Sequence, residues 1–205
     1  PACAFRECNM VEEIQLPSTL EKIGSHAFQN CGSLKTITIP DSVESIGAYA
    51  FQNCDALTSV SVSKNLTSLG EYAFSENAVL STVSLPGTLQ TVPGHCFENS
   101  VGLVTVTLGE GTIAISDRAF QNCTALKTVN LPEGLKSVGH YAFSGCTGLE
   151  SMDLPDSVES IGHRAFENCT ALAEVQIPKS WNSCPSSNGY LSGQGAIFAG
   201  CTALK

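Results

Sequence analysis

Residues 23–45 read IGSHAFQNCGSLKTITIPDSVES, and this stretch decides the fold because its pattern returns along the whole chain. The first eight phenylalanines are 23 residues apart, whereas the last interval is 32 residues and therefore contains an insertion of 9 residues. A strict period of this length predicts a stacked solenoid, in which each repeat contacts only its neighbours. The nine phenylalanines are Phe5, Phe28, Phe51, Phe74, Phe97, Phe120, Phe143, Phe166 and Phe198.

The composition excludes several classes of protein. The chain has 205 residues, of which 42% are apolar and 14% are charged, and its net charge is −9. Nucleic acids and anionic membrane surfaces attract clustered Lys and Arg, so we expect no nucleic-acid partner for this acidic chain. No apolar run approaches the roughly 20 residues of a membrane span, so we expect no membrane insertion in this segment.

Both ends of the chain lie inside a repeat. Pro1 comes four residues before Phe5, and Lys205 follows Leu204, which stands six residues after Phe198. Neither end has a recognisable capping sequence or signal peptide. We therefore expect residues 1–205 to form a single repeat domain that is a fragment of a longer protein.

Apolar residues at fixed distances from each phenylalanine predict the structure of one repeat. Residues 36–39 alternate polar and apolar side chains, which is typical of a short strand with one buried face. Pro40 ends this strand because it cannot continue the ladder. Val43 and Ile46 form a second apolar pair, which predicts a second short extended run.

The segment around each Ala–Phe pair is predicted to form a single turn of helix. Two residues after the phenylalanine the chain has mostly Asn or Gly, as at Asn30 and Gly145. Both residue types tolerate the left-handed conformation that closes a helix. Glu76 departs from this rule, so we expect a different turn in its repeat.

The sequence LKTITIP at residues 34–40, followed by Val43, Ile46-Gly47, Ala50-Phe51 and Cys54, resembles the BspA-like class of leucine-rich repeats. The resemblance covers nearly the whole chain. It implies a curved right-handed coil of eight to nine repeats, with a parallel β-sheet on the concave face and short strands and single helical turns elsewhere. It also implies display on a cell surface or secretion, and binding of a protein or extracellular-matrix ligand. It carries over no catalytic residue, because the shared motif is structural.

The chain departs from the family pattern in its middle repeats, where the turn geometry is therefore uncertain from sequence. The substituted positions lie between residues 63 and 116. Ser63 and Gly109 replace Pro, Pro93 and Ser116 replace Gly, and Asn77 and Ser100 replace Cys.

The ten cysteines suggest either disulfides or a metal site. Equivalent residues in stacked coils point the same way, which disfavours disulfides between neighbours, and no CxxC motif provides a zinc-ribbon spacing. We interpret the regularly spaced cysteines as buried thiols that pack as small apolar groups. Cys184 is a candidate partner for Cys201 or Cys169, and the many unpaired thiols are also compatible with an intracellular protein. Seven cysteines lie three residues after a phenylalanine: Cys8, Cys31, Cys54, Cys123, Cys146, Cys169 and Cys201.

The outward side chains of the main strands form the first candidate binding surface. Hydroxyl groups dominate it, spaced about 4.8 Å between coils and about 6.7 Å along a strand. Three interpretations compete: Thr and Ser suit a half-exposed strand, the surface binds a protein or glycan, or a flat Thr array binds ice. The predicted surface comprises Thr36, Thr38, Ser59, Ser61, Thr82, Ser84, Thr105, Thr107, Thr128, Asn130, Ser151 and Asp153.

Three further regions are weaker candidates. A polar and aromatic row, which includes Tyr49 and Tyr72, precedes each phenylalanine by two residues and is expected to cover the turn. His140 and His163 share a position in adjacent repeats, although no carboxylate repeats beside them to complete a metal site. The insertion at about residues 182–195 contains Tyr190, a candidate contact residue because loops inserted in solenoids project outwards.

These observations predict a non-catalytic binding or adhesion scaffold that recognises a protein or matrix ligand through the strand face. The alternatives are a structural spacer in a long surface or matrix protein and, less favoured, an ice-binding protein. We predict no enzyme, cofactor or metal, because no Ser-His-Asp, paired-carboxylate or phosphate-loop pattern has a spacing that a solenoid would bring together.

Overall fold

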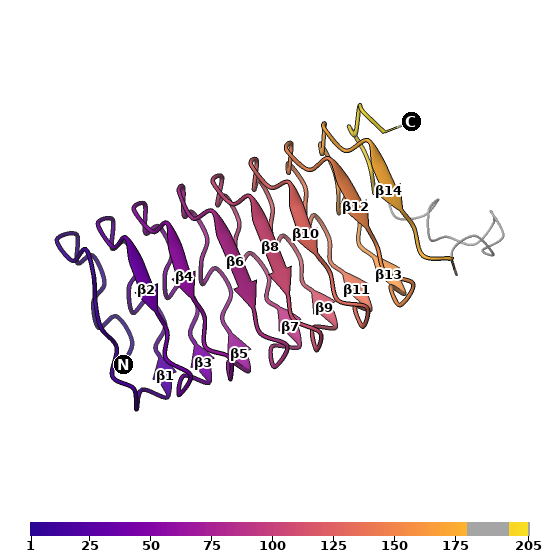
Figure 1. Ribbon diagram of the computed structural model, residues 1–205. Helices are drawn as coiled ribbons and strands as arrows, with labels where there is room; N and C mark the ends of the chain where they lie inside the picture. The colour runs from indigo at the N-terminus through magenta and orange to yellow at the C-terminus, as the bar shows by residue number, and fades with distance from the viewer. Residues whose placement is uncertain (180–196, 205) are drawn as a thin grey trace.

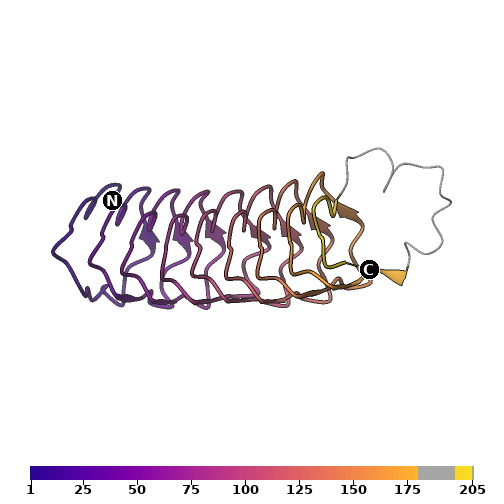
Figure 2. The same ribbon diagram turned by 90° about the horizontal axis from the view of Figure 1, so that it is seen from above.

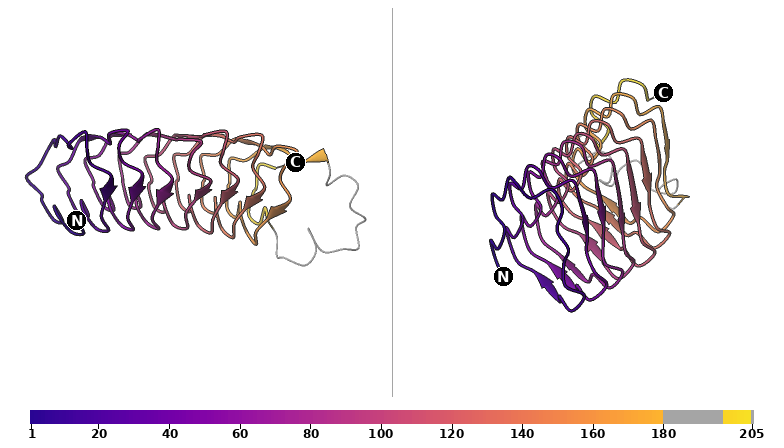
Figure 3. Two further views of the ribbon diagram at one scale, coloured as in Figure 1. Left: turned by 90° about the horizontal axis from the view of Figure 1, so that it is seen from below. Right: turned by 60° about the vertical axis from the view of Figure 1, so that its left-hand side comes forward.

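The computed structural model describes residues 1–179 and 197–204, and it is a stack of similar coils. The two chain ends lie at opposite ends of the stack (Figure 1). Seen from above and below, the coils form a long row that curves only gently (Figures 2 and 3). The predicted leucine-rich repeat solenoid with parallel strands is confirmed. We name each coil by the phenylalanine that begins it.

The main strands lie side by side in register, one per coil. β4 and β8 each pair in parallel with β6 between them, and each paired residue lies 23 positions from its partner, as Thr82 does from Thr105. The order is β10-β8-β6-β4-β2 in one sheet and β12-β14 in another. The main strands are β2 (Thr36–Thr38), β4 (Ser59–Ser61), β6 (Thr82–Leu85), β8 (Thr105–Leu108), β10 (Thr128–Asn130), β12 (Ser151–Asp153) and β14 (Glu174–Gln176).

The second strands have two residues each and also form two sheets, β1-β3-β5 and β7-β9-β11-β13. β5 and β7 do not pair with each other. Where second strands of successive coils do pair, the backbone N–H that follows the strand donates to a carbonyl of the preceding coil, as Gly70 does to Ile46 at 2.8 Å. Pro93 stands at the equivalent position after β7 and has no N–H, which removes the bond to Leu69. These strands are β1 (Lys22–Ile23), β3 (Ser45–Ile46), β5 (Ser68–Leu69), β7 (Thr91–Val92), β9 (Ala114–Ile115), β11 (Ser137–Val138) and β13 (Ser160–Ile161).

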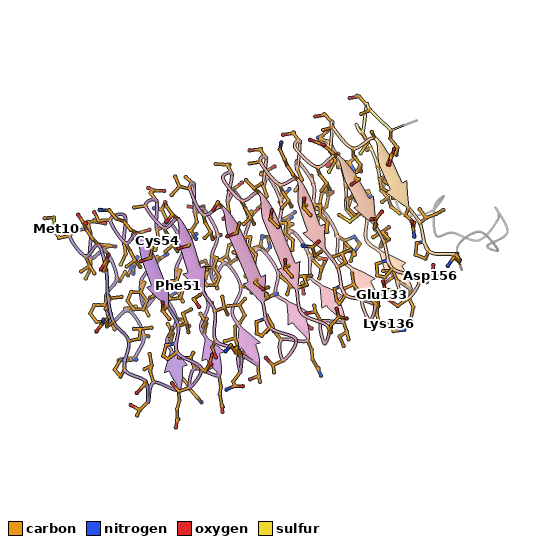
Figure 4. The ribbon with its side chains drawn as sticks, viewed as in Figure 1. Met10, Phe51, Cys54, Glu133, Lys136 and Asp156 are labelled. Atoms are coloured by element: carbon orange, nitrogen blue, oxygen red, sulfur yellow. The ribbon has the colours of Figure 1, made fainter. Side chains whose placement is uncertain are left out.

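A column of stacked phenylalanine rings forms the centre of the core. Successive ring centroids lie 5.1 to 5.6 Å apart with nearly parallel planes. The rings from Phe51 to Phe166 are fully buried, whereas Phe5 at the end of the stack is 38% exposed. Figure 4 labels Phe51 and Cys54, whose side chains lie among the core side chains of their coil. Stacking therefore buries apolar surface that no single coil could bury alone.

The single helical turn predicted around Ala–Phe is wrong. The described residues contain no α-helix, and the segment is a ladder between coils. The N–H groups of His26, Phe28 and Asn30 donate to carbonyls of the next coil at 2.8 to 2.9 Å, while the N–H groups between them close tight turns within their own coil. An α-helix would instead direct these N–H groups along its own axis towards carbonyls four residues earlier, and would not alternate bonds within the coil with bonds to the next coil.

Left-handed residues make this alternation possible. Asn30 has the predicted positive φ of 60°, and Glu76, which we expected to differ, also has φ of 60°. A second left-handed residue, two positions before the phenylalanine, was not predicted: His26 has φ of 57° and Tyr72 has φ of 58°. Histidine is enriched in this conformation, whereas a bulky tyrosine is not. At His26 and Tyr49 we attribute it to the hydrogen bond that the backbone N–H makes with the next coil, to Ala48 at 2.9 Å and to Glu71 at 3.0 Å.

Truncation of a central ring should be far more destabilising than truncation of a terminal one. Phe97→Ala should cost about 3–5 kcal/mol because it leaves a cavity in a fully packed column. Phe5→Ala should cost much less, since that ring is already partly exposed. Urea unfolding followed by circular dichroism measures both, and equal losses would contradict the role assigned to the column.

Candidate functional site

The structure places the twelve predicted strand-face residues on one side of the main strands. Ten are exposed, and Thr105 and Thr107 are half-buried. At the first strand position Thr36, Ser59, Thr82, Thr105 and Thr128 are consecutive partners. Ser151 and Asp153 belong to the separate β12-β14 sheet, so the twelve residues do not form one uninterrupted array.

Apart from the carboxylate of Asp153, the strand face offers neutral hydrogen-bonding groups to solvent. Of these twelve side chains, the described contacts join only Asn130 and Thr107, whose Nδ2 donates to Oγ1 at 3.1 Å. The other hydroxyls lie in rows and are free to donate to and accept from a polar partner. No aromatic residue belongs to the set, so stacking on sugar rings is not available there.

A hollow of about 410 Å³ lies where β10 and β12 are unpaired. Asn130 and Asp153 line it from the strand face, and Glu133, Asp156 and Lys179 line it from the following loops. Asp156 accepts hydrogen bonds from the backbone N–H and Nζ of Lys179, both at 2.9 Å. These contacts lower the pKa of Asp156 below its ordinary value. Figure 4 labels Glu133 and Asp156 in neighbouring coils.

Tyr190, the candidate contact residue of the insertion, lies outside the described residues, as does Cys184. Both therefore stay predictions.

The described cysteines are free thiols, and most of them are buried. The regularly spaced thiols also donate hydrogen bonds, which was not predicted. Cys54 Sγ lies 3.1 Å from the carbonyl oxygen of Phe28, and Cys123 Sγ lies 3.1 Å from that of Phe97. Burial raises the pKa of Cys54 to about 12, so its thiol stays protonated and unreactive at neutral pH.

The two substituted positions in this row keep a donor of similar size. Ser100 Oγ donates to the carbonyl of Phe74 at 2.8 Å. Asn77 Nδ2 donates to the carbonyl of Phe51 at 3.0 Å, and its Oδ1 accepts the N–H of Cys54 at 2.9 Å. The row therefore requires a buried hydrogen-bond donor, and this donor need not be sulfur.

The row two residues before each phenylalanine is a stack of half-exposed rings. His26, Tyr49, Tyr72 and His95 stack with centroids 4.4 to 4.9 Å apart. Since each inner ring covers the faces of its neighbours, only ring edges are open to a ligand. This arrangement supports the prediction that the row covers the turn.

His140 and His163 contact each other as part of the backbone structure. The ring Nδ1 of His140 accepts the backbone N–H of His163 at 2.7 Å, and Asp117 Oδ1 accepts the backbone N–H of His140 at 2.7 Å. Nδ1 is therefore occupied. In residues 1–179 and 197–204 no group of three His, Cys, Asp or Glu side chains is placed to hold a metal ion.

A larger groove, of about 1180 Å³, runs along the second strands and was missed from the sequence. It extends from Thr67 to Gly162, across β5, β7, β9, β11 and β13. The substitution of Pro93 for Gly was its only signal, because it interrupts pairing within the groove. For the described part of the chain, no helix combines the length and apolar character needed to cross a membrane.

Comparisons with known proteins agree with this architecture. A family model described as BspA type leucine rich repeat region (6 copies) matches residues 1–126 and 90–190. No curated protein matches the chain.

Three solved structures are similar to the chain. A leucine-rich repeat protein of Bacteroides ovatus has 29% identity and a TM-score of 0.67, over 87% of this chain and 52% of that one. A leucine-rich repeat protein of T. pallidum has 30% identity and a TM-score of 0.68, over 72% and 69%. A leucine-rich cell surface protein of Faecalibacterium prausnitzii has 26% identity and a TM-score of 0.56, over 98% and 60%. The matched region thus spans about half of the first structure.

Alkaline pH should destabilise the protein steeply. The pKa of an unfolded thiol is about 8.5, whereas burial raises the pKa of Cys54 and Cys169 to about 12. As the pH rises above about 9, the unfolded chain loses thiol protons that the folded chain keeps. Each such thiol then removes about 1.4 kcal/mol of stability per pH unit. Urea midpoints under reducing conditions should fall between about pH 9 and pH 11.

The matched control is the double variant Cys123→Ser and Cys146→Ser, which keeps two donors but removes two titrating groups. Its midpoint should fall less steeply over the same range. A parent protein whose midpoint does not change up to about pH 10.5 would contradict buried, protonated thiols.

Proposed function

Because the chain belongs to the BspA-type leucine-rich repeat family, we propose that it is a non-catalytic scaffold that recognises a protein ligand at a cell surface. The observation that carries this proposal is the row of exposed, in-register hydroxyl groups on β2, β4, β6, β8 and β10. The core positions are fixed by packing, so the outward residues are the ones free to determine a partner.

The chemistry of the strand face suits a polar protein surface. Its hydroxyls have short side chains, so ordering them on binding costs little conformational entropy. They both donate and accept, which fits the polar groups of a protein partner. The five strands from β2 to β10 span about 19 Å at about 4.8 Å per strand, and an extended matrix or surface protein could lie across them.

Placement at a cell surface is supported by one of the similar structures, which is that of a leucine-rich cell surface protein. A matrix ligand is the natural partner in that setting. A structural spacer is the second candidate, favoured by the observation that most hydroxyls would suit an exposed strand without any ligand. Serine, asparagine and the gap between β10 and β12 make the face less regular than an ice-binding array requires.

Three charges added to the strand face should strongly weaken ligand capture. The triple variant Thr82→Lys, Thr105→Lys and Thr107→Lys places like charges at the centre of the proposed surface and should weaken capture on immobilised extracellular-matrix proteins by about tenfold or more. Thermal unfolding should stay nearly unchanged, since these side chains point away from the core.

The matched control carries the same three charges elsewhere. Thr124, Thr147 and Thr170 are exposed threonines of consecutive coils outside the strand face, and their replacement by Lys should leave capture intact. Unaltered capture by the strand-face variant would remove this assignment and favour the spacer.

A further inference from the structure

The groove along the second strands is a separate surface from the strand face. None of the twelve strand-face residues lines it. Its floor is built from small residues of successive coils: Thr91, Ala114, Ser137 and Ser160 are consecutive partners on β7, β9, β11 and β13. At about 4.8 Å per coil, the five coils that it crosses give a floor about 19 Å long.

Glycines allow the coils along the groove to pack closely. A Cβ added to Gly139 would lie 2.5 Å from the backbone nitrogen of Asp117, and one added to Gly162 would lie 2.4 Å from that of His140. Such contacts are too close for any side chain, so these positions exclude anything larger than hydrogen. The hollow is therefore a fixed consequence of coil packing.

Main-chain groups are left unpaired inside the groove. β5 and β7 do not pair, and both lie within the lining. Among the described backbone hydrogen bonds, no N–H of the next coil donates to the carbonyls of Thr67 and Leu69. At the following junction, the equivalent carbonyls of Gln90 and Val92 do accept such bonds. Pro93 cannot supply the missing donor. Acceptors at this point of the groove are thus available to a ligand.

Two carboxylates with no basic partner line the same groove. Glu71 and Asp117 are exposed and occupy equivalent positions two coils apart. Among the described ion pairs neither contacts a Lys or Arg, although Asp117 Oδ1 accepts a backbone N–H. The residue between them is Gly94, and Glu71 Oε1 lies 3.8 Å from the point where a Cβ of that residue would stand. Two coils correspond to about 10 Å.

We propose that this groove binds an extended peptide that carries two basic side chains three residues apart. A polyproline II segment advances about 3.1 Å per residue and has three residues per turn, so such side chains lie on one face about 9 Å apart. This spacing matches that of Glu71 and Asp117. The groove holds about six residues of such a chain, whose N–H and ammonium groups meet carbonyls and carboxylates.

Fluorescence anisotropy with two labelled peptides tests the spacing. The sequence PPKPPKPPP has lysines three apart, and PPKKPPPPP has the same charge with adjacent lysines. The first should bind at least about threefold more tightly, because only it reaches both carboxylates without leaving the groove. Equal binding of the two peptides would show attraction to net charge alone and would overturn the proposal.

Variants of the protein locate the site. Glu71→Gln with Asp117→Asn should weaken binding of PPKPPKPPP by about tenfold, since each exposed pair contributes about threefold. Glu110→Gln with Glu174→Gln removes the same charge from outside the groove and should leave binding unchanged. Thr91→Trp fills the groove without a charge change and should also abolish binding. Wild-type affinity in either groove variant would overturn the proposal.

The assay also separates this site from the strand face. The Thr82, Thr105 and Thr107 lysine variant should bind PPKPPKPPP as the wild-type protein does, apart from a small nonspecific weakening that salt removes. Circular dichroism of each variant verifies that the coils remain folded. Failure of strand-face capture with intact peptide binding would leave this inference standing.

Discussion

Main-chain hydrogen bonds between successive coils are the interaction on which the rest of the structure depends. Successive coils are bonded through the main strands, the second strands and the Ala–Phe turn, except that β10 does not pair with β12 and β5 does not pair with β7. Because the backbone bonds between regular repeats join residues 22 to 24 positions apart, those repeats must keep a constant length. The phenylalanine column then follows, because rings at equivalent positions of bonded coils lie about 5 Å apart and therefore stack.

Most of the fold could be predicted from the sequence because the signals were repeated. The alternation at residues 36–39 correctly predicted both the strand and its buried face, with Ile37 and Ile39 in the core. Asn30 and its equivalents were correctly expected to be left-handed. The outward direction of Thr36 and Thr38 followed from the same alternation, so the strand face was located, although its ligand was not.

What the sequence did not reveal depends on contacts between coils. The turn at Ala27-Phe28 has the residues of a short helix. Its alternate N–H groups instead donate to carbonyls of the next coil, which the sequence of one repeat does not show. His26 gives no sign of its positive φ, because that conformation is imposed by the same contact. The groove is likewise formed by several coils together.

The junction between the Phe51 and Phe74 coils has little strand pairing and several hydrogen bonds from side chains. β5 and β7 are unpaired there, and β4 pairs with β6 through only Ser59 and Thr82. Side chains supply other links, because Asn77 bonds to Phe51 and Cys54, and Thr88 Oγ1 donates to the carbonyl of Leu66 at 2.6 Å. Under tension along its length, the array would yield first at this joint, where side chains and the backbone bonds of the turns, rather than paired second strands, bear the load.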